Sequence, residues 1–273
     1  MKLYNRIIIK RKSIVIIVAF IIIAVLVSLF VVIWVKTDTA LSPTLPKNLT
    51  TKKNDVIETE KIVKKEVIVE KPIIPSFDKS KYSTTVPSSI WVVVNKQHPL
   101  VPISYTPVNL ITTVGATISS SAQIDFEAMN NTALASGINF TIVSSYRSYD
   151  TQNYLYNNYV ASYGQVASDT FSARPGYSEH QTGFTIDLGS STGASCNLDS
   201  CFRSTIEGTW LAQHAYEYGF LLRYPIDKQQ ITGYMSEPWH FRYIGRELAL
   251  EMKNKSISTL EEFFNISGGE IYL

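Results

Sequence analysis

The feature that most constrains this chain is an apolar run close to its N-terminus. Residues 14–35 read IVIIVAFIIIAVLVSLFVVIWV and are apolar throughout except for Ser28. At about 1.5 Å per residue, a helix of this length is roughly 33 Å long, which is enough to cross a hydrocarbon core of about 30 Å. The run therefore predicts one transmembrane helix over residues 13–35, which separates a short N-terminal segment from the rest of the chain.

A cleaved signal peptide is the alternative interpretation of this run. The apolar region of a signal peptide is about 7–15 residues long and ends in a cleavage site of small residues. The run in this chain is longer, and it ends in Trp34 and Val35 before Lys36. These properties favour an uncleaved anchor.

The charges before the apolar run predict the orientation of the helix in the membrane. The first 12 residues hold five basic residues and no acidic residue, and such positive flanks stay in the cytoplasm. We therefore expect a cytoplasmic basic tail over residues 1–12. The cell membrane would be crossed once, and everything after Lys36 would be extracytoplasmic.

The composition changes again after the run. Residues 36–80 are rich in Thr, Lys, Glu and Pro and have no sustained apolar period. A segment of this kind buries too little apolar surface to offset the entropy cost of ordering, so we expect a flexible extracytoplasmic linker. Residues 81–273 are aromatic-rich and mixed, and about 190 residues are enough for one domain with its own core.

Local patterns in residues 81–273 indicate both helices and strands. Apolar and β-branched runs predict strands at 90–95, 138–145, 219–224 and 239–244. Capping signals and periodicity predict helices at 121–136, 151–163, 208–218 and 245–253, with Asp150 as the N-cap and Gly164 as the end of the second. Because strands and helices do not alternate regularly, we expect an α+β domain with a small antiparallel sheet flanked by helices.

The charge of this predicted domain differs from that of the whole chain. Of the 25 basic and 23 acidic residues, 14 basic and 7 acidic residues precede position 81. The domain therefore has 11 basic and 16 acidic residues, a formal net charge of −5. Proteins that bind nucleic acid normally carry a basic patch or excess, so nucleic acid is not an expected partner.

The two cysteines, Cys196 and Cys201, are close together in the sequence. A pair in an extracytoplasmic domain often forms a disulfide. Their spacing is not that of a C-x-x-C redox motif, and a thiolate metal site needs more ligands than this pair supplies. We expect a Cys196–Cys201 disulfide that closes a small loop.

The segment SEHQTGFTID, residues 178–187, holds two residue types that bind zinc, His180 and Asp187. Three protein ligands are typical of a catalytic zinc site, because they leave one position open for water. Residues seven apart on a helix lie two turns, or about 10.5 Å, apart along its axis, so a straight helix cannot bring both side chains to one ion. A bend near Gly183 is therefore needed to bring His180 and Asp187 together.

The segment EPWH, residues 237–240, can supply what the first segment lacks. Pro238 disfavours a helix interior and favours an extended conformation at Glu237. His240 is then a candidate third ligand, and Glu237 is a candidate general base beside the metal that takes a proton from the attacking water.

Together these segments resemble the zinc D-stereospecific peptidases of cell walls. That family contains the vancomycin-resistance D,D-carboxypeptidases, the D-alanyl-D-alanine dipeptidases and the bacterial L,D-carboxypeptidases. Its signature, Ser-x-His-x-x-Gly-x-Ala-x-Asp followed about fifty residues later by Glu-x-x-His, matches Ser178, His180, Gly183, Asp187, Glu237 and His240. Thr185 stands where the family usually has Ala. The resemblance implies a Zn²⁺ cofactor on His180, Asp187 and His240, with Glu237 as the catalytic base.

The resemblance extends over about residues 90–250 and implies roles for further residues. SSYRS at residues 144–148 is similar to a family motif whose arginine faces the scissile site and the carboxylate of the substrate, a role that passes here to Arg147 with Gln152. Ser178 would hydrogen-bond the peptide. Tyr224 and Trp239 either shape the peptide pocket or fill the core. Arg174 either reaches the substrate or pairs with a nearby acid.

These residues predict a zinc-dependent carboxypeptidase that removes a terminal D-amino acid, D-Ala, from peptidoglycan stem peptides. An endopeptidase of the same family is the nearest alternative, because an arginine can also stabilise an oxyanion. A wall-binding module that kept the fold but lost catalysis is a second alternative. A structural membrane protein positioned by its anchor is a third, and it predicts no bound zinc.

Overall fold

The computed structural model describes residues 77–273 of the chain. The predicted tail at 1–12, the predicted anchor at 13–35 and most of the predicted linker lie outside the described residues and stay predictions. Among residues 77–273, no helix is both long enough and apolar enough to cross a bilayer.

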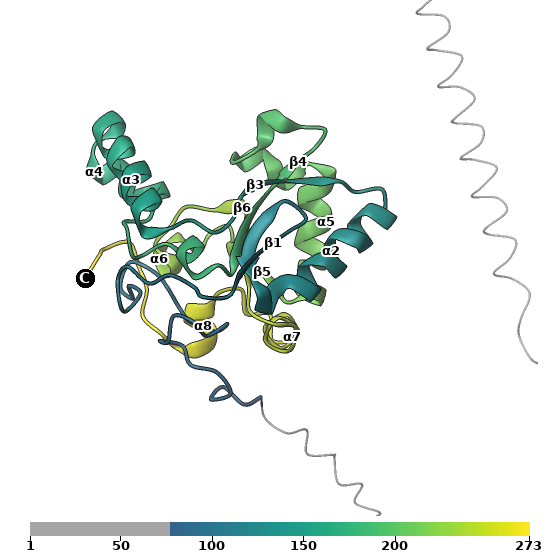
Figure 1. The fold of residues 1–273 in the computed structure, drawn as a ribbon, viewed down its shortest axis with the longest axis horizontal. Helices are drawn as coiled ribbons and strands as arrows, with labels where there is room; N and C mark the ends of the chain where they lie inside the picture. Colours follow the sequence, from purple (N-terminus) through teal and green to yellow (C-terminus); the bar gives the residue numbers. More distant parts are fainter. Residues whose placement is uncertain (1–76) are drawn as a thin grey trace, which may run out of the picture. The chain divides into compact units, whose positions relative to one another are not determined.

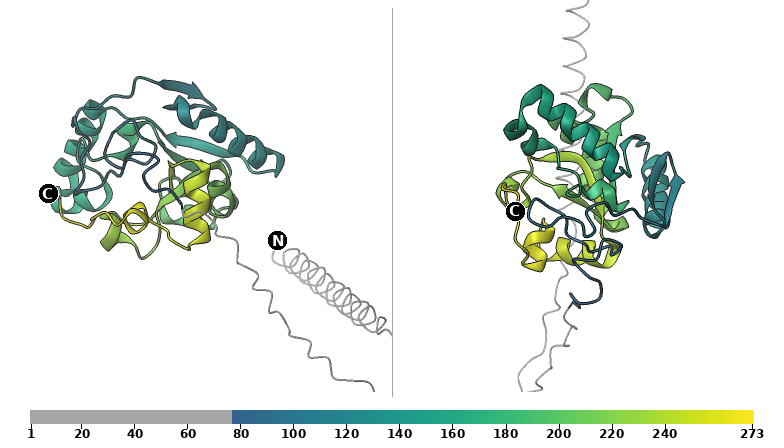
Figure 2. Two further views of the ribbon diagram at one scale, coloured as in Figure 1. Left: turned by 90° about the horizontal axis from the view of Figure 1, so that it is seen from below. Right: turned by 60° about the vertical axis from the view of Figure 1, so that its left-hand side comes forward.

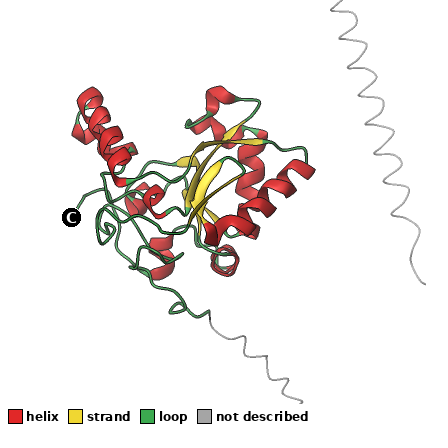
Figure 3. Ribbon diagram, in the orientation of Figure 1, coloured by secondary structure: helices red, strands yellow, loops and turns green. Residues whose placement is uncertain are grey.

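A four-stranded antiparallel sheet lies at the centre of the domain (Figures 1 and 3). Its strands follow the order β3 (Phe140–Ser144), β4 (Thr185–Ser190), β6 (Glu237–Tyr243) and β5 (Phe220–Tyr224). A separate antiparallel hairpin consists of β1 (Leu110–Thr113) and β2 (Ala116–Ser119). The α+β class with a small antiparallel sheet is confirmed, and the hairpin is an element that the sequence patterns did not predict.

Seven α-helices surround this sheet within the described residues. They are α2 (Gln123–Ala135), α3 (Tyr149–Tyr163), α4 (Gln165–Phe171), α5 (Ile206–His214), α6 (Gln229–Thr232), α7 (Arg246–Asn254) and α8 (Leu260–Phe264). In Figures 1 and 2, α3 and α4 form a pair that projects from the domain at the end away from α2.

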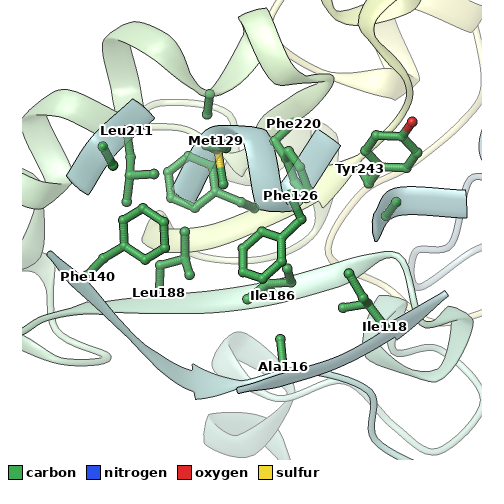
Figure 4. Packing of buried hydrophobic residues seen from close by; sticks show 14 of the residues in the cluster. Ala116, Ile118, Phe126, Met129, Phe140, Ile186, Leu188, Leu211, Phe220 and Tyr243 are labelled. Atoms are coloured by element: carbon green, nitrogen blue, oxygen red, sulfur yellow. The ribbon is translucent and has the colours of Figure 1, made fainter. Parts of the chain in front are cut away.

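The main hydrophobic core lies between the sheet and α2 (Figure 4). From α2, Phe126 and Met129 contribute side chains spaced as on one helix face, and both are fully buried. From β4, Ile186 and Leu188 face them and are also fully buried. The core therefore occupies one face of β4.

The opposite face of the sheet is free to hold polar side chains. Successive side chains of a strand point to opposite faces, so Asp187, between Ile186 and Leu188, points away from the core. On β6, His240 precedes the core residue Phe241 and points the same way. Asp187 and His240 are direct partners in the β4–β6 register, which places them side by side on that face.

Most predicted elements are confirmed with small shifts of their ends. The predicted strands at 138–145, 219–224 and 239–244 correspond to β3, β5 and β6, and the predicted helices correspond to α2, α3, α5 and α7. The third predicted helix, 208–218, is α-helical only to His214 and continues as a 3-10 turn over Ala215–Tyr218.

The predicted strand at 90–95 is wrong. The segment is buried but has no strand beside it, apart from an isolated bridge between Asn95 and His98. Two of its carbonyl groups bind a side chain instead, since Nη2 of Arg242 donates to the carbonyls of Ile90 at 3.1 Å and Val92 at 3.0 Å. A guanidinium with several donors thus replaces the ladder of a neighbouring strand.

The predicted N-cap of α3 is also wrong. Ser148 caps the helix, and its hydroxyl accepts a hydrogen bond from the Thr151 amide at 3.2 Å. Asp150 lies inside the first turn, where a negative charge favours the helix dipole. The predicted end at Gly164 is confirmed, with a φ of 79° there.

Two further features bear on the predicted organisation. The Cys196–Cys201 disulfide is present and closes the loop that follows β4. At the N-terminal edge, the ring of Phe77 packs 5.5 Å from that of Trp91 and 5.6 Å from that of Phe263. Phe77, which lies four residues before the predicted boundary at 81, thus packs with the domain.

Substitutions at a buried and an exposed position of α2 should have different effects on the free energy of unfolding. Phe126→Ala removes a fully buried ring and should lower the free energy of unfolding by about 3–5 kcal/mol. Ile124→Ala on the same helix changes a side chain that is 79% exposed and should cost about 0.5 kcal/mol or less. Chemical denaturation measures both, and equal losses in the two variants would contradict this description of the core.

Candidate active site

A cavity of about 370 Å³ opens on the sheet face that carries Asp187 and His240. Its polar lining includes Arg147, Gln152, Ser178, Glu179, His180, Asp187, Glu237 and His240. Its apolar and aromatic lining includes Tyr159, Phe171, Leu198, Tyr224, Tyr234, Met235 and Trp239. A concave site with a few convergent polar groups and an apolar remainder is the usual form of a small-ligand site.

A short 3-10 turn brings His180 to the β4–β6 pair. The turn covers Glu179–Thr182 and ends at Gly183, whose φ of 75° sends the chain into β4. A Cβ atom at Gly183 would lie 2.9 Å from Leu110 and 3.2 Å from the Ser119 amide nitrogen, so both backbone conformation and space require glycine. The bend that the sequence predicted near Gly183 is confirmed.

The three candidate ligands converge in the cavity. Nε2 of His180 lies 3.2 Å from one oxygen of Asp187, and Nδ1 of His240 lies 3.2 Å from the other. One ligand atom from each residue falls within 4.8 Å of the other two, and all three residues are buried. The far side of the His180 ring is also fixed, because Nδ1 lies 2.7 Å from the Ser145 carbonyl, which can only accept. Nε2 of His180 therefore has a free lone pair.

The electrostatics of this cluster favour a cation. One oxygen of Asp187 is buried and has no hydrogen-bond partner among the described residues. Burial would lower the pKa of His240, but the carboxylates of Asp187, Glu179 and Glu237 raise it well above its ordinary value. Two imidazoles and one carboxylate are ligands that zinc prefers, and three of them leave a position open. The residues present therefore fit a catalytic zinc ion.

Glu237 lies beside this cluster at the start of β6. Its Oε2 is 3.2 Å from Nδ1 of His240, and its side chain is 12% exposed. The β5–β6 register is irregular between Leu222 and Tyr224, opposite Pro238, where a proline can be accommodated because no ladder amide is needed. The extended conformation predicted for Glu237 is confirmed. Burial raises the pKa of Glu237 above its ordinary value.

Arg147 enters the same cavity from the segment after β3. Its Nη2 lies 4.0 Å from Asp187 and donates to the Ser144 hydroxyl at 3.0 Å. Its Nη1 donates to the Gln152 side-chain oxygen at 2.7 Å. The Gln152 amide nitrogen in turn donates to the Ala173 carbonyl at 2.6 Å. Gln152 is buried and orients the guanidinium through its hydrogen bond with Nη1, and both residues line the cavity.

The remaining predicted residues divide into two groups. Ser178, Tyr224 and Trp239 line the cavity, and the Tyr224 ring packs 4.7 Å from the His240 ring. Trp239 also packs against the main core, so it both lines the cavity and fills part of the core. Arg174 does not line the cavity. Its guanidinium makes two hydrogen bonds to Asp169, at 3.1 and 2.8 Å, so it pairs with a nearby acid.

Several lining residues were not predicted. Tyr159 and Phe171 come from the α3–α4 pair, Met235 from the segment before β6, and Leu198 from the disulfide loop. Their packing follows from tertiary structure, and no local pattern distinguishes them from surface apolar residues. Glu179 lies between the motif residues Ser178 and His180. Its charge within that motif was the one sequence signal that could have marked it as part of the site.

This set of groups can hydrolyse an amide bond next to a carboxylate. His180, Asp187 and His240 would hold a zinc ion with one position left open for water, and Glu237, 3.2 Å from His240, would act on that water. Arg147 offers a fork of donors that matches a carboxylate.

Comparison with known proteins supports this interpretation. The sequence pattern of the VanY D-alanyl-D-alanine carboxypeptidase family matches residues 115–246. The putative carboxypeptidase YodJ of Bacillus subtilis (strain 168) is 37% identical over 188 residues, which cover 65% of this chain and 68% of YodJ. A D-alanyl-D-alanine carboxypeptidase of Enterococcus faecium is 40% identical over 141 residues, or 51% of this chain and 41% of that protein.

Solved structures give the same result. The LD-carboxypeptidase LdcB is 36% identical with a TM-score of 0.61, and the match covers 66% of this chain and 88% of LdcB. A mutant of the vancomycin resistance D,D-pentapeptidase VanY in complex with Zn(II) is 30% identical with a TM-score of 0.55. That match covers 64% of this chain and 98% of the VanY chain. The site geometry, the sequence relatives and the structural neighbours agree, and this chain belongs to the VanY family of D-alanyl-D-alanine carboxypeptidases.

Proposed function

We propose that this chain is a zinc-dependent carboxypeptidase that removes a terminal D-alanine from peptidoglycan stem peptides. The observation that carries the proposal is one cavity containing a three-ligand cluster, the carboxylate of Glu237 and an arginine 4.0 Å from the ligand Asp187. His180, Asp187 and His240 would hold the zinc ion. When bound, zinc lowers the pKa of water to about 7 and polarises the scissile carbonyl.

Glu237 would carry the proton transfers. It takes a proton from the attacking water and gives it to the amine of the leaving D-alanine as the C–N bond breaks. The products are a shortened peptide with a new carboxylate and free D-alanine. A pKa raised by burial suits this role, because the carboxylate becomes a stronger base toward water while its conjugate acid can still give the proton to the leaving amine.

Arg147 would bind the free carboxylate of the substrate. Its hydrogen bonds to Ser144 and Gln152 hold the guanidinium in place before the substrate arrives, which reduces the cost of ordering it on binding. Ser178 would hydrogen-bond the peptide, while Tyr224 and Trp239 would contact its apolar parts. Gln152 would act through Arg147 and need not touch the substrate.

Two of the three rival functions would use less of this site. An endopeptidase does not require a carboxylate clamp, so Arg147 and its two supporting residues favour an exopeptidase. An inactive wall-binding module does not require Glu237 to lie 3.2 Å from a ligand nitrogen. The retention of ligands and base in one cavity supports catalysis.

The first test compares the wild-type chain with Glu237→Gln on synthetic tetrapeptide and pentapeptide stems. Wild type should release D-alanine in a zinc-dependent manner, detected by mass spectrometry, and a chelator should abolish the release. Glu237→Gln should lose at least about 100-fold in rate, since general base catalysis contributes about 10²–10⁴-fold.

Zinc bound per chain is the control in this comparison, and it should equal that of wild type. Cleavage by Glu237→Gln at the wild-type rate with zinc bound would refute the mechanism. The same experiment assigns the specificity, because loss of D-alanine from the pentapeptide alone means D,D-cleavage and loss from the tetrapeptide means L,D-cleavage.

The second test separates carboxylate recognition from catalysis. Arg147→Met should lower kcat/KM for a peptide with a free terminal carboxylate by about 10- to 150-fold, because a hydrogen bond to a charged group is worth about 1.5–3 kcal/mol. A matched peptide with a terminal amide should be cleaved slowly by both proteins, with little difference between them. An equal loss on both peptides would show that Arg147 does not read the carboxylate.

The membrane location is a further part of the proposal. The apolar run at 14–35, the basic residues before it and the location of peptidoglycan outside the membrane support an anchor at 13–35 and an extracytoplasmic catalytic domain.

This topology predicts the behaviour of two forms of the chain in cells. The full chain should remain in the membrane fraction at high salt and alkaline pH, and its catalytic domain should be digested by protease added outside the membrane. A chain without residues 13–35 should be absent from that fraction. Recovery of the full chain in the soluble fraction would contradict the anchor.

A further inference from the structure

Beneath the cavity, four charged side chains form a buried group that the proposed mechanism leaves unused. We refer to Glu179, Arg223, Arg242 and Glu261 as the buried quartet. Their side chains are 0–1% exposed. Two carboxylates and two guanidiniums balance in charge, which is the condition under which buried ions are tolerated.

One oxygen of Glu179 is fully engaged within the quartet. Oε1 accepts from Nε of Arg223 at 2.8 Å and from Nη1 of Arg242 at 2.9 Å. Arg223 is itself held by two hydrogen bonds to Glu261, at 2.9 and 2.7 Å. Glu261 is held in turn by the Asn95 amide at 2.9 Å. These hydrogen bonds therefore fix the position and orientation of the Glu179 carboxylate.

The second oxygen of Glu179 faces the metal ligand His240. Oε2 of Glu179 and Nε2 of His240 are both buried, and neither has a hydrogen-bond partner among the described residues. They lie 3.6 Å from each other, a few tenths of an ångström beyond hydrogen-bond distance. Buried polar atoms are nearly always paired, and these two are a complementary acceptor and donor.

We infer that Glu179 is the positioning residue of His240, accepting a hydrogen bond from Nε2–H when the imidazole binds the metal through Nδ1. A metal-bound imidazole usually donates its second N–H to a carboxylate or carbonyl, which fixes its tautomer and ring orientation. For His180 the Ser145 carbonyl is this acceptor, and it lies 2.7 Å from Nδ1. The two histidines would thus bind the metal through different ring nitrogens, one supported by a neutral acceptor and one by a charged acceptor.

The supports of Glu179 come from parts of the chain that are far apart in the sequence. Asn95 and Glu261 lie outside residues 115–246, the part that matches the family pattern. The segments on both sides of that region therefore complete the network under the metal site. This inference rests on the proposed role of His240 as a ligand, but not on the proposed substrate.

The test measures zinc affinity of the purified full-length chain by competition with a chelator of known affinity. Glu179→Gln keeps the shape of the side chain but removes its charge, and it should weaken zinc binding by about 10- to 100-fold, the usual effect of losing such a partner. Glu207→Gln is the matched control, because Glu207 is also buried but accepts hydrogen bonds from the loop at 191–192, away from the cavity. Its zinc affinity should equal that of wild type.

A second measurement uses wild type alone and therefore does not depend on whether Glu179→Gln folds. The chain has four histidines, so ¹⁵N spectra of the zinc-bound chain labelled at the imidazole nitrogens are simple. His240 should show a protonated Nε2 and a metal-bound Nδ1, and His180 should show the reverse.

A protonated Nδ1 on His240 would overturn the inference. Wild-type zinc affinity in a Glu179→Gln chain that unfolds at the same temperature as wild type without metal would also overturn it. Neither readout involves peptide cleavage. A chain that meets both expectations but cleaves no stem peptide would refute the proposed function and leave this inference standing.

Discussion

The antiparallel pairing of β4 with β6 is the interaction on which the rest of the site depends. It places Asp187 directly opposite His240, although the two residues are far apart in the sequence. The turn that ends at Gly183 then adds His180 from the chain immediately before β4. Glu237 follows from the same pairing, because it lies three residues before His240 at the start of β6. One strand pair and one turn thus fix the positions of the proposed ligands and the proposed base.

The sheet keeps two incompatible environments apart. On one face, Ile186, Leu188 and Phe241 contribute to an apolar core that contains no unpaired charge among the residues described. On the other face, alternation along the same strands presents Asp187, His240 and Arg242. Buried charge is costly unless it is paired and hydrogen-bonded. Each charge of the buried quartet has an opposite charge within 2.9 Å, whereas a bound cation would supply the partner that one oxygen of Asp187 lacks within the described part of the chain.

The sequence predicted the parts of this structure that depend on local chemistry. The bend at Gly183, the extended conformation at Glu237 and the helix over 121–136 follow from a glycine, a proline and an apolar period, which act within a few residues. The strand predicted at 90–95 failed because periodicity reports burial but not the identity of the hydrogen-bond partner, which here is the distant Arg242. The pairing of Arg223 with Glu261 and the position of Leu198 in the cavity wall also arise only after folding.

A direct test of this account is X-ray diffraction from zinc-soaked crystals at wavelengths on both sides of the zinc absorption edge. The account predicts one anomalous peak in the cavity, at about 2.0–2.2 Å from Nε2 of His180, Nδ1 of His240 and an oxygen of Asp187. A fully occupied peak that excludes any of these three residues, or no peak in the cavity at saturating zinc, would contradict it.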